Sequence, residues 1–362
     1  MKRLLLQITV ICMIFSIITL VPQCLVAEDN GFRFNQDKCG CYSNHGNGTT
    51  KGLNNGWINK RERRGECCDL HDTNVNGFDL QNANLVGADL SHANWRGCDL
   101  DGARLRHARL VKTTFGFHGN PASRPRPASM KNAGLRHAVL VNANLQGVDL
   151  HNAFLEHAIL HSVLLNKADL TCAKLIRADL LHAQINKADL TEANFNYAIL
   201  DDASLGQSVM QKANFTNARM KRTTLMYGDA SKAIFDQAVM SWARVRGMKL
   251  ERASFKGTNL YKADLSSSNA DDASFKNARM ESGKFVGTTF RRANLINANL
   301  YGANLNKANL YEAYLQNADL RHADLSETVL HKARLRGAKF NAATKLPISR
   351  KKAKSRGMVF VE

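Results

Sequence analysis

The sequence predicts a solenoid, a chain wound into square coils of 20 residues that stack into a rod. From about Leu80 to Phe340, a large apolar residue ends nearly every block of five residues. Of the 42 block ends between Leu135 and Phe340, 40 are Leu, Ile, Val, Met or Phe, and 31 of the 42 residues two positions earlier are Ala. Neither an α-helix nor a flat strand keeps residues with this spacing on one face. A coil that turns through a right angle in each block points all of them inward.

Stacking of such coils places residues 20 apart directly above one another. The pattern therefore predicts a core ladder of five aromatic rings, Phe195, Phe215, Phe235, Phe255 and Phe275. The two block ends without a large side chain, Ala230 and Ala270, are 40 residues apart and share one side of the coil. Methionines on the opposite side are expected to compensate for them, because a protein core is close-packed. These are Met220, Met240 and Met280.

The units Ala-Asp-Leu and Ala-Asn-Leu recur throughout the chain, for example at Ala88-Asp89-Leu90 and Ala303-Asn304-Leu305. In these units the chain resembles the pentapeptide-repeat family, whose motif is Ala, then Asp or Asn, then Leu and two variable residues. The resemblance covers most of the chain. It implies an all-β fold, a right-handed quadrilateral β-helix over residues 70–340, whose coils pair as ladders about 4.8 Å apart.

Residues 1–27 are expected to be an export signal. Lys2 and Arg3 precede an apolar run from Leu4 to Val21, and cleavage is expected after Ala27. The run is also about long enough to cross a membrane, so an uncleaved anchor is the alternative. Either way, the sequence predicts a secreted or periplasmic protein whose body lies outside the cytoplasm.

Residues 28–69 are expected to form a small Cys-rich cap, because the open end of a solenoid needs cover. Four cysteines cluster there, Cys39, Cys41, Cys67 and Cys68. In an exported protein such a cluster favours two disulfides, and a zinc site is the alternative. The pairing does not follow from the sequence. Cys98 and Cys172 lie inside the repeats and are expected to be unpaired.

Two segments outside the repeat pattern are candidates for binding an acidic partner. Residues 116–130 lack the motif and hold three of the five prolines, which predicts an exposed loop carrying Arg124 and Arg126. A tolerated surface insertion is the alternative. Residues 341–362 form the exit from the last coil and a basic tail, which is expected to be solvated and unconstrained by the coil. Its cations are Arg350, Lys351, Lys352, Lys354 and Arg356.

The formal net charge of +19 favours a polyanionic partner. We expect a macromolecule, which is an acidic polymer, an anionic membrane surface or a protein. A small-molecule substrate is not expected, since a rod with a filled core offers no deep pocket. The sequence holds no catalytic constellation, cofactor motif or strong metal motif, and His137 is expected to stack on His157 as a surface feature. The predicted function is a non-enzymatic exported binding or structural scaffold.

The family resemblance suggests a second function. Some pentapeptide-repeat proteins resemble B-form DNA in shape and charge and protect DNA gyrase from quinolones. Such mimicry requires a negative surface and a cytoplasmic protein. The basic charge and the predicted export signal disfavour it here.

We predict that the mature protein begins near Glu28 and carries disulfides among the four clustered cysteines. Mass spectrometry with and without reductant, on protein purified from its native compartment, measures both. An intact N-terminus would favour the anchor. Four free thiols would contradict the disulfides and favour zinc, which binds cysteine thiolates.

Overall fold

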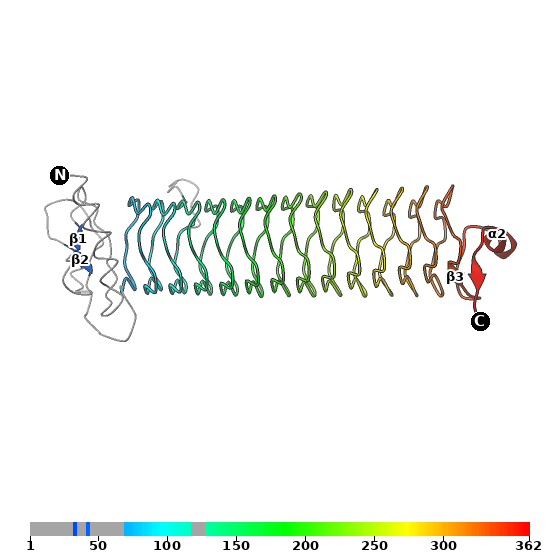
Figure 1. The fold of residues 1–362 in the computed structure, drawn as a ribbon, viewed down its shortest axis with the longest axis horizontal. Helices are drawn as coiled ribbons and strands as arrows, with labels where there is room; N and C mark the ends of the chain where they lie inside the picture. The colour runs from blue at the N-terminus through cyan, green and yellow to red at the C-terminus, as the bar shows by residue number, and fades with distance from the viewer. Residues whose placement is uncertain (1–31, 35–40, 44–68, 117–126) are drawn as a thin grey trace, which may run out of the picture.

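In the computed structural model the repeats form one long rod of stacked coils (Figure 1). The structure describes residues 32–34, 41–43, 69–116 and 127–362, and only the backbone of the first two segments. Its named elements are short. They are β1 (Phe32–Phe34), which pairs antiparallel with β2 (Cys41–Ser43), then β3 (Lys339–Phe340), α2 (Arg350–Ser355) and β4 (Val359–Phe360), which pairs parallel with β3.

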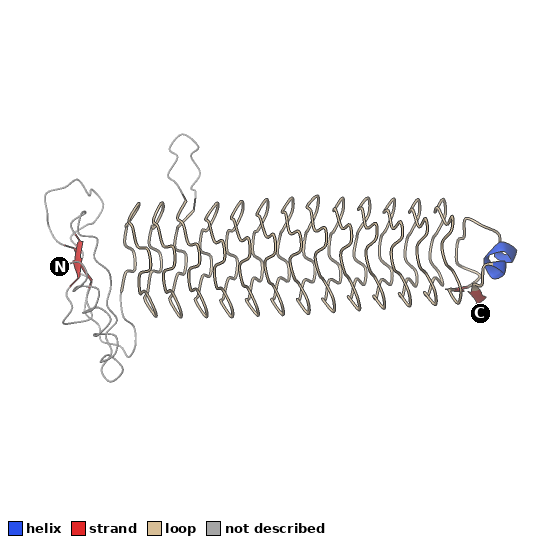
Figure 2. Cartoon of the chain, turned by 45° about the horizontal axis from the view of Figure 1, so that its top comes forward, coloured by secondary structure: helices blue, strands red, loops and turns tan. Residues whose placement is uncertain are grey.

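Backbone hydrogen bonds between successive coils hold the rod together. The residue before each block end forms an isolated parallel bridge with the residue 20 positions further on, as Asp169 does with Asp189. Leu170 N donates to Asp189 O at 2.7 Å, and Asp189 N donates to Ala168 O at 3.0 Å. Each side of the coil contributes a single bridge, so the β-helix is built from bridges and turns, which Figure 2 draws as loops.

The corners are β-turns that the motif itself stabilises. Ala173 N donates to Leu170 O at 3.0 Å, and Cys172 between them has a φ of 58°, as the second central residue of a type II turn does. Asp169, just before the leucine, accepts a hydrogen bond from Thr171 N at 2.9 Å. This side-chain cap explains the preference for Asp or Asn at that position, since both are short acceptors that favour turns.

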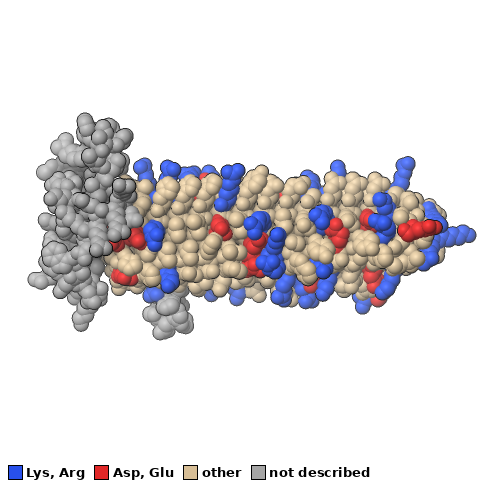
Figure 3. All heavy atoms as spheres, turned by 90° about the horizontal axis from the view of Figure 1, so that it is seen from below, with Lys and Arg blue, Asp and Glu red and all other residues tan. Residues whose placement is uncertain are grey.

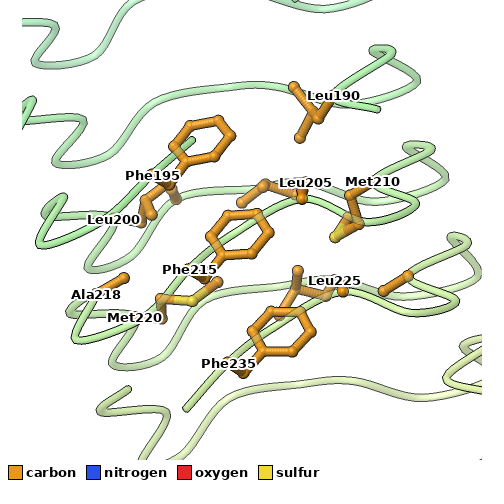
Figure 4. Packing of buried hydrophobic residues seen from close by; sticks show 14 of the residues in the cluster. Leu190, Phe195, Leu200, Leu205, Met210, Phe215, Ala218, Met220, Leu225 and Phe235 are labelled. Atoms are coloured by element: carbon orange, nitrogen blue, oxygen red, sulfur yellow. The ribbon is translucent and has the colours of Figure 1, made fainter. Parts of the chain in front are cut away.

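The core is a single column of apolar side chains. Block ends and the small residues two positions earlier point inward and are buried along the described rod. Leu205 and Met220 lie beside an aromatic ladder in this column (Figure 4). Its rings stack with centroids 4.7 to 5.0 Å apart, and its members are Phe195, Phe215, Phe235, Phe255 and Phe275. The coil repeat sets the ring spacing, so aromatic stacking adds to the burial of apolar area.

Where the small inward position is not Ala, it often carries a hydroxyl or thiol that bonds to the backbone. Thr258 Oγ1 donates to Phe235 O at 2.7 Å, and Cys98 Sγ donates to Val75 O at 2.8 Å. Burial raises the pKa of the Cys98 thiol to about 11, so this thiol stays protonated near neutral pH. The thiols of Cys98 and Cys172 are both free.

Neighbouring coils compensate for the two missing large side chains. Met248 occupies a position that usually holds Ala, and its Sδ lies 3.1 Å from the backbone N of Gly228, two residues before Ala230. Ala270 lies one coil before the large, buried Phe290 on the same side. The three methionines predicted on the opposite side are buried as well. Volume is therefore balanced across a coil and between coils, as close packing requires.

The excursion from the coil is shorter than the sequence suggested. Ser129 bridges the coils before and after it, so residues 127–130 belong to a coil and not to the predicted loop 116–130. Two residues that form a bridge across this segment are 30 apart in the sequence instead of 20. The stacked positions in the earlier coils are therefore displaced by ten residues relative to those in the later coils. Outside the described residues lie 117–126, which include Arg124 and Arg126.

The C-terminal segment is folded onto the last coil, which corrects the expectation of an unconstrained tail. α2 begins after the N-cap Ser349, Ala353 in this helix is fully buried, and β4 pairs with β3 of the last coil. Arg356 Nη2 donates to Leu330 O at 3.1 Å and also to the carbonyl of Ala333. The segment therefore covers the end of the rod and satisfies backbone acceptors that the end of a solenoid exposes.

Much of the predicted N-terminal organisation falls outside the described residues. This holds for the apolar run from Leu4 to Val21 and for Cys39, Cys67 and Cys68, whereas Cys41 begins β2, of which only the backbone is described. Within the part of the chain that the structure describes, no helix is long and apolar enough to cross a membrane.

We predict that Leu160→Asp lowers the free energy of unfolding by roughly 4 kcal/mol or more, because it places an unpaired charge in a narrow apolar core. Leu160 is fully buried. Thermal denaturation followed by circular dichroism measures the change. Lys167→Asp places the same residue at an exposed turn and should change the stability by less than about 0.5 kcal/mol. Coincident melting curves for Leu160→Asp and the wild type would contradict the inward register.

A second prediction concerns the C-terminal cap. Arg356→Gln should lower the free energy of unfolding by about 1–3 kcal/mol, because two carbonyl groups lose a charged donor. Lys351→Gln removes the same charge from an exposed position of α2 and should be nearly neutral. Chemical denaturation of both variants separates the two effects. Equal losses of stability would mean that the charge of the helix matters and the contacts of Arg356 do not.

Candidate binding surface

The surface of the rod consists of columns of side chains, because each block has three outward positions and residues 20 apart stack. In one column Lys212 Nζ lies 2.6 Å from Glu192 Oε1, and Arg292 donates to both carboxylate oxygens of Asp272 at 2.7 and 2.8 Å. These hydrogen bonds hold the pKa of Asp272 below its usual value. Three of the five cations in this column pair with its three carboxylates, whereas Lys232 and Arg252 have no carboxylate of the described residues within ion-pairing distance. Its members are Glu192, Lys212, Lys232, Arg252, Asp272, Arg292, Glu312 and Lys332.

A second set of columns carries cations that lack such partners. In one of these columns each residue forms a β-bridge with the residue one coil further on, and this column contains Arg104, Lys174 and Arg334. The turns that follow the bridge residues contribute further cations, which lie two or three positions later in the sequence. Only Arg136 of this set has a carboxylate of the described residues within ion-pairing distance, Glu156 at 3.1 Å. We name this set the basic edge. It comprises Arg104, Arg106, Arg136, Lys174, Arg177, Lys256, Lys276, Arg334 and Arg336.

An acidic column lies on the side of the coil that precedes the basic edge. Its carboxylates serve the turns, as Asp189 does by accepting a hydrogen bond from Thr191 N at 2.9 Å. The aspartates of this column are Asp79, Asp99, Asp149, Asp169, Asp189 and Asp229. Figure 3 shows one side of the rod, where Lys and Arg side chains extend along its length with carboxylates between them. Charge is thus distributed by column, and eight of the nine cations of the basic edge have no carboxylate of the described residues within ion-pairing distance.

Three imidazoles stack on the basic edge. The ring centroids of His107 and His137 are 5.1 Å apart, and those of His137 and His157 are 4.9 Å apart. Arg177 follows in the same column and lies over the ring of Tyr197, 5.6 Å from its centroid. The sequence predicted the stack of His137 on His157 but missed His107, because the ten-residue shift in register conceals its position.

The C-terminal cations that the sequence predicted for binding differ in what they contact. Lys351 and Lys352 are exposed on α2, while Lys354 Nζ lies 5.4 Å from the ring centroid of Phe360. Arg350 donates to Ala342 O at 3.1 Å, and Arg356 bonds to the carbonyls of the last coil, so both take part in the cap. No group of three His, Cys, Asp or Glu side chains among the described residues is arranged to hold a metal ion.

One known protein family matches the sequence of the chain. The family of pentapeptide repeats matches in eight copies, which span residues 66–94, 83–116, 128–166, 160–192, 188–225, 238–277, 273–310 and 308–344. These copies cover most of the chain and coincide with the coils of the rod. No curated protein matches the chain significantly.

Solved structures of pentapeptide-repeat proteins are similar to the chain. HetL from Nostoc sp. strain PCC 7120, involved in heterocyst differentiation regulation, is 25% identical over 73% of this chain and 89% of HetL, with a TM-score of 0.22. The protein Rfr23 from Cyanothece 51142 is 39% identical over 27% of this chain and 63% of the Rfr23 chain, with a TM-score of 0.20. Full-length QnrB1, a plasmid-mediated fluoroquinolone resistance protein, is 14% identical over 58% of this chain and 85% of QnrB1, with a TM-score of 0.28.

The repeats themselves identify the family of the chain. The eight matched copies, the inward Leu and Ala positions and the bridges between residues 20 apart all agree. The chain therefore belongs to the pentapeptide-repeat family, whose members form right-handed quadrilateral β-helices.

Proposed function

We propose that the protein is a non-enzymatic exported scaffold that presents its basic edge to an extended polyanionic macromolecule. The observation that carries the proposal is the set of cations from Arg104 to Arg336 along one edge of the rod, of which all but Arg136 lack an ion-pair partner among the described residues. A polyanion that lies along the rod meets several of these cations without bending. Each contact releases counterions, so the contacts add to the affinity even when each is weak.

A scaffold fits this architecture better than an enzyme does. The interior is filled by block-end side chains that are buried along the rod. Histidines of the basic edge contact other histidines instead of a nucleophile, as His137 does with His107 and His157. The predicted export signal adds the expectation that the partner is an acidic component outside the cytoplasm. Cell fractionation tests this part of the proposal separately.

Gyrase protection, which the family resemblance suggests, is the second candidate function. Mimicry of DNA requires a surface dominated by carboxylates. Here the acidic column is confined to one side and is interrupted by Ser129 and Val209, and its carboxylates accept hydrogen bonds from their own turns. The basic edge beside it favours the binding of a polyanion over the imitation of one.

We predict that Lys256→Gln combined with Lys276→Gln weakens binding to an acidic polysaccharide and to anionic lipid vesicles. The two lysines are one coil apart and unpaired among the described residues, so their loss should also reduce the slope of log Kd against log salt by roughly one to two. A salt titration of Kd for both proteins measures this.

The matched control is Lys212→Gln combined with Lys332→Gln. It removes the same charge from the column that begins at Glu192, where both lysines pair with glutamates, and should change Kd by less than about twofold. Absence of binding, or binding that is indifferent to salt and to the basic-edge variant, would overturn the proposed function.

A further inference from the structure

The histidine stack gives one part of the basic edge a property that the lysines and arginines lack. His107, His137 and His157 are all exposed at the corner of the rod, and their rings lie nearly parallel, with interplanar angles of 18° and 9°. Each has a positive φ between 57° and 60°, so the turn projects each ring outward from the corner. The edges of three imidazoles therefore face solvent in one line, each about a coil from the next.

Charged groups surround the stack on both sides. Arg106 and Arg136 each precede a histidine of the stack in sequence, and Arg177 continues the column beyond His157. The one carboxylate among these neighbours is Glu156, and it is already paired with Arg136 at 3.1 Å. Among the described residues Glu156 thus offsets Arg136 alone, and Arg106 and Arg177 leave the stack in a positive environment.

This environment opposes protonation of the middle ring. Desolvation between the flanking rings lowers the pKa of His137 below its ordinary value of 6.5, and positive charge on His157, His107, Arg106 and Arg136 lowers it further. A bound anion would raise the pKa of His137 again, because it offsets the repulsion from the neighbouring positive charges and stabilises the imidazolium form.

We propose that Arg106, His107, Arg136, His137, His157 and Arg177 form a proton-dependent binding site for a linear acidic polysaccharide. This site deepens the function proposed above and rests on it. It names the ligand class and a condition under which the ligand binds.

Contacts of the aromatic rings favour a polysaccharide over a single-stranded nucleic acid. Proteins that bind single strands offer free aromatic faces on which bases stack. Here Arg136 and Lys174 lie 4.6 and 4.7 Å from the ring centroid of Phe154, and Arg177 covers Tyr197. The histidine rings stack on one another. The site therefore offers N–H donors and positive charge, which suit carboxylates, and few free ring faces.

The direction of the pH effect follows from linkage. Binding of a polyanion raises the pKa of His137 relative to the free protein, so the complex takes up a proton there. Affinity must then increase as the pH falls through the bound-state pKa of His137, and level off below its free-state value. For His137 the free-state value lies below 6.5. The carboxylates of a polyuronate remain ionised in this window, since ordinary carboxyl groups titrate near pH 4.

The test compares the full chain with a variant that replaces His107, His137 and His157 by Asn. Asn tolerates positive φ, and Asn277, Asn297 and Asn317 already occupy the same column further along the rod. Isothermal titration calorimetry with polygalacturonate at pH 7.5 and 5.5, at one salt concentration, measures the affinity. The wild type should bind about tenfold tighter at pH 5.5, the size expected of three exposed charge pairs, and the variant should lose this gain.

A matched control replaces His92, His182 and His322 by Asn. These histidines also have positive φ but lie at another corner, so the control should keep the full pH dependence. A pH dependence that survives in the stack variant would overturn the site, as would its absence from the wild type. Absence of binding at both pH values would overturn the proposed function as well. Equal affinity for duplex DNA or for anionic vesicles would overturn the choice of ligand.

Discussion

The backbone hydrogen bond from each inward block-end residue to a carbonyl one coil further on is the contact on which the rest of the rod depends. In the pair of Leu170 N and Asp189 O, the two atoms are 2.7 Å apart. This bond fixes the distance between coils and the side of the coil on which each residue lies. The small position two residues before the leucine follows from it, because a larger side chain would push the chain away from its neighbour. Where a larger residue does occur, as at Met248, the neighbouring coil supplies the space with Gly228 and Ala230.

The same spacing determines the chemistry of the surface. Outward side chains repeat every coil, so charges of like or opposite sign meet at a fixed distance. Where signs alternate, as for Lys212 and Glu192, ion pairs form and the column contributes little net field. Where one sign recurs without a partner, as on the basic edge, the field adds along the rod. The binding properties of such a protein depend less on its net charge than on how the charges are sorted into columns.

The C-terminal segment shows how a charged run can serve the fold. Five cations between Arg350 and Arg356 suggested a solvated tail, but Ala353 is buried and Arg356 bonds to the backbone of the last coil. At the end of a solenoid, backbone carbonyl groups lack the N–H donors that a further coil would supply. The guanidinium group of Arg356 donates hydrogen bonds to two of these carbonyls. Capping also covers an edge to which another chain would otherwise pair.

The sequence by itself determined the coil, its inward positions and the aromatic ladder from Phe195 to Phe275. Each of these depends on a requirement that every block of five meets on its own, so it leaves a periodic signal. Three features were decided only by the tertiary structure. The chain leaves the coil for ten residues instead of fifteen, because Ser129 forms bridges with residues of the coils before and after it. His107 joins the histidine stack because of that same shift. Apart from Arg136, the cations of the basic edge form no ion pair among the described residues, and the nearby carboxylate of Asp236 accepts from Ser254 Oγ and Lys256 N instead. All three depend on contacts between residues of different coils, which the spacing within a block does not specify.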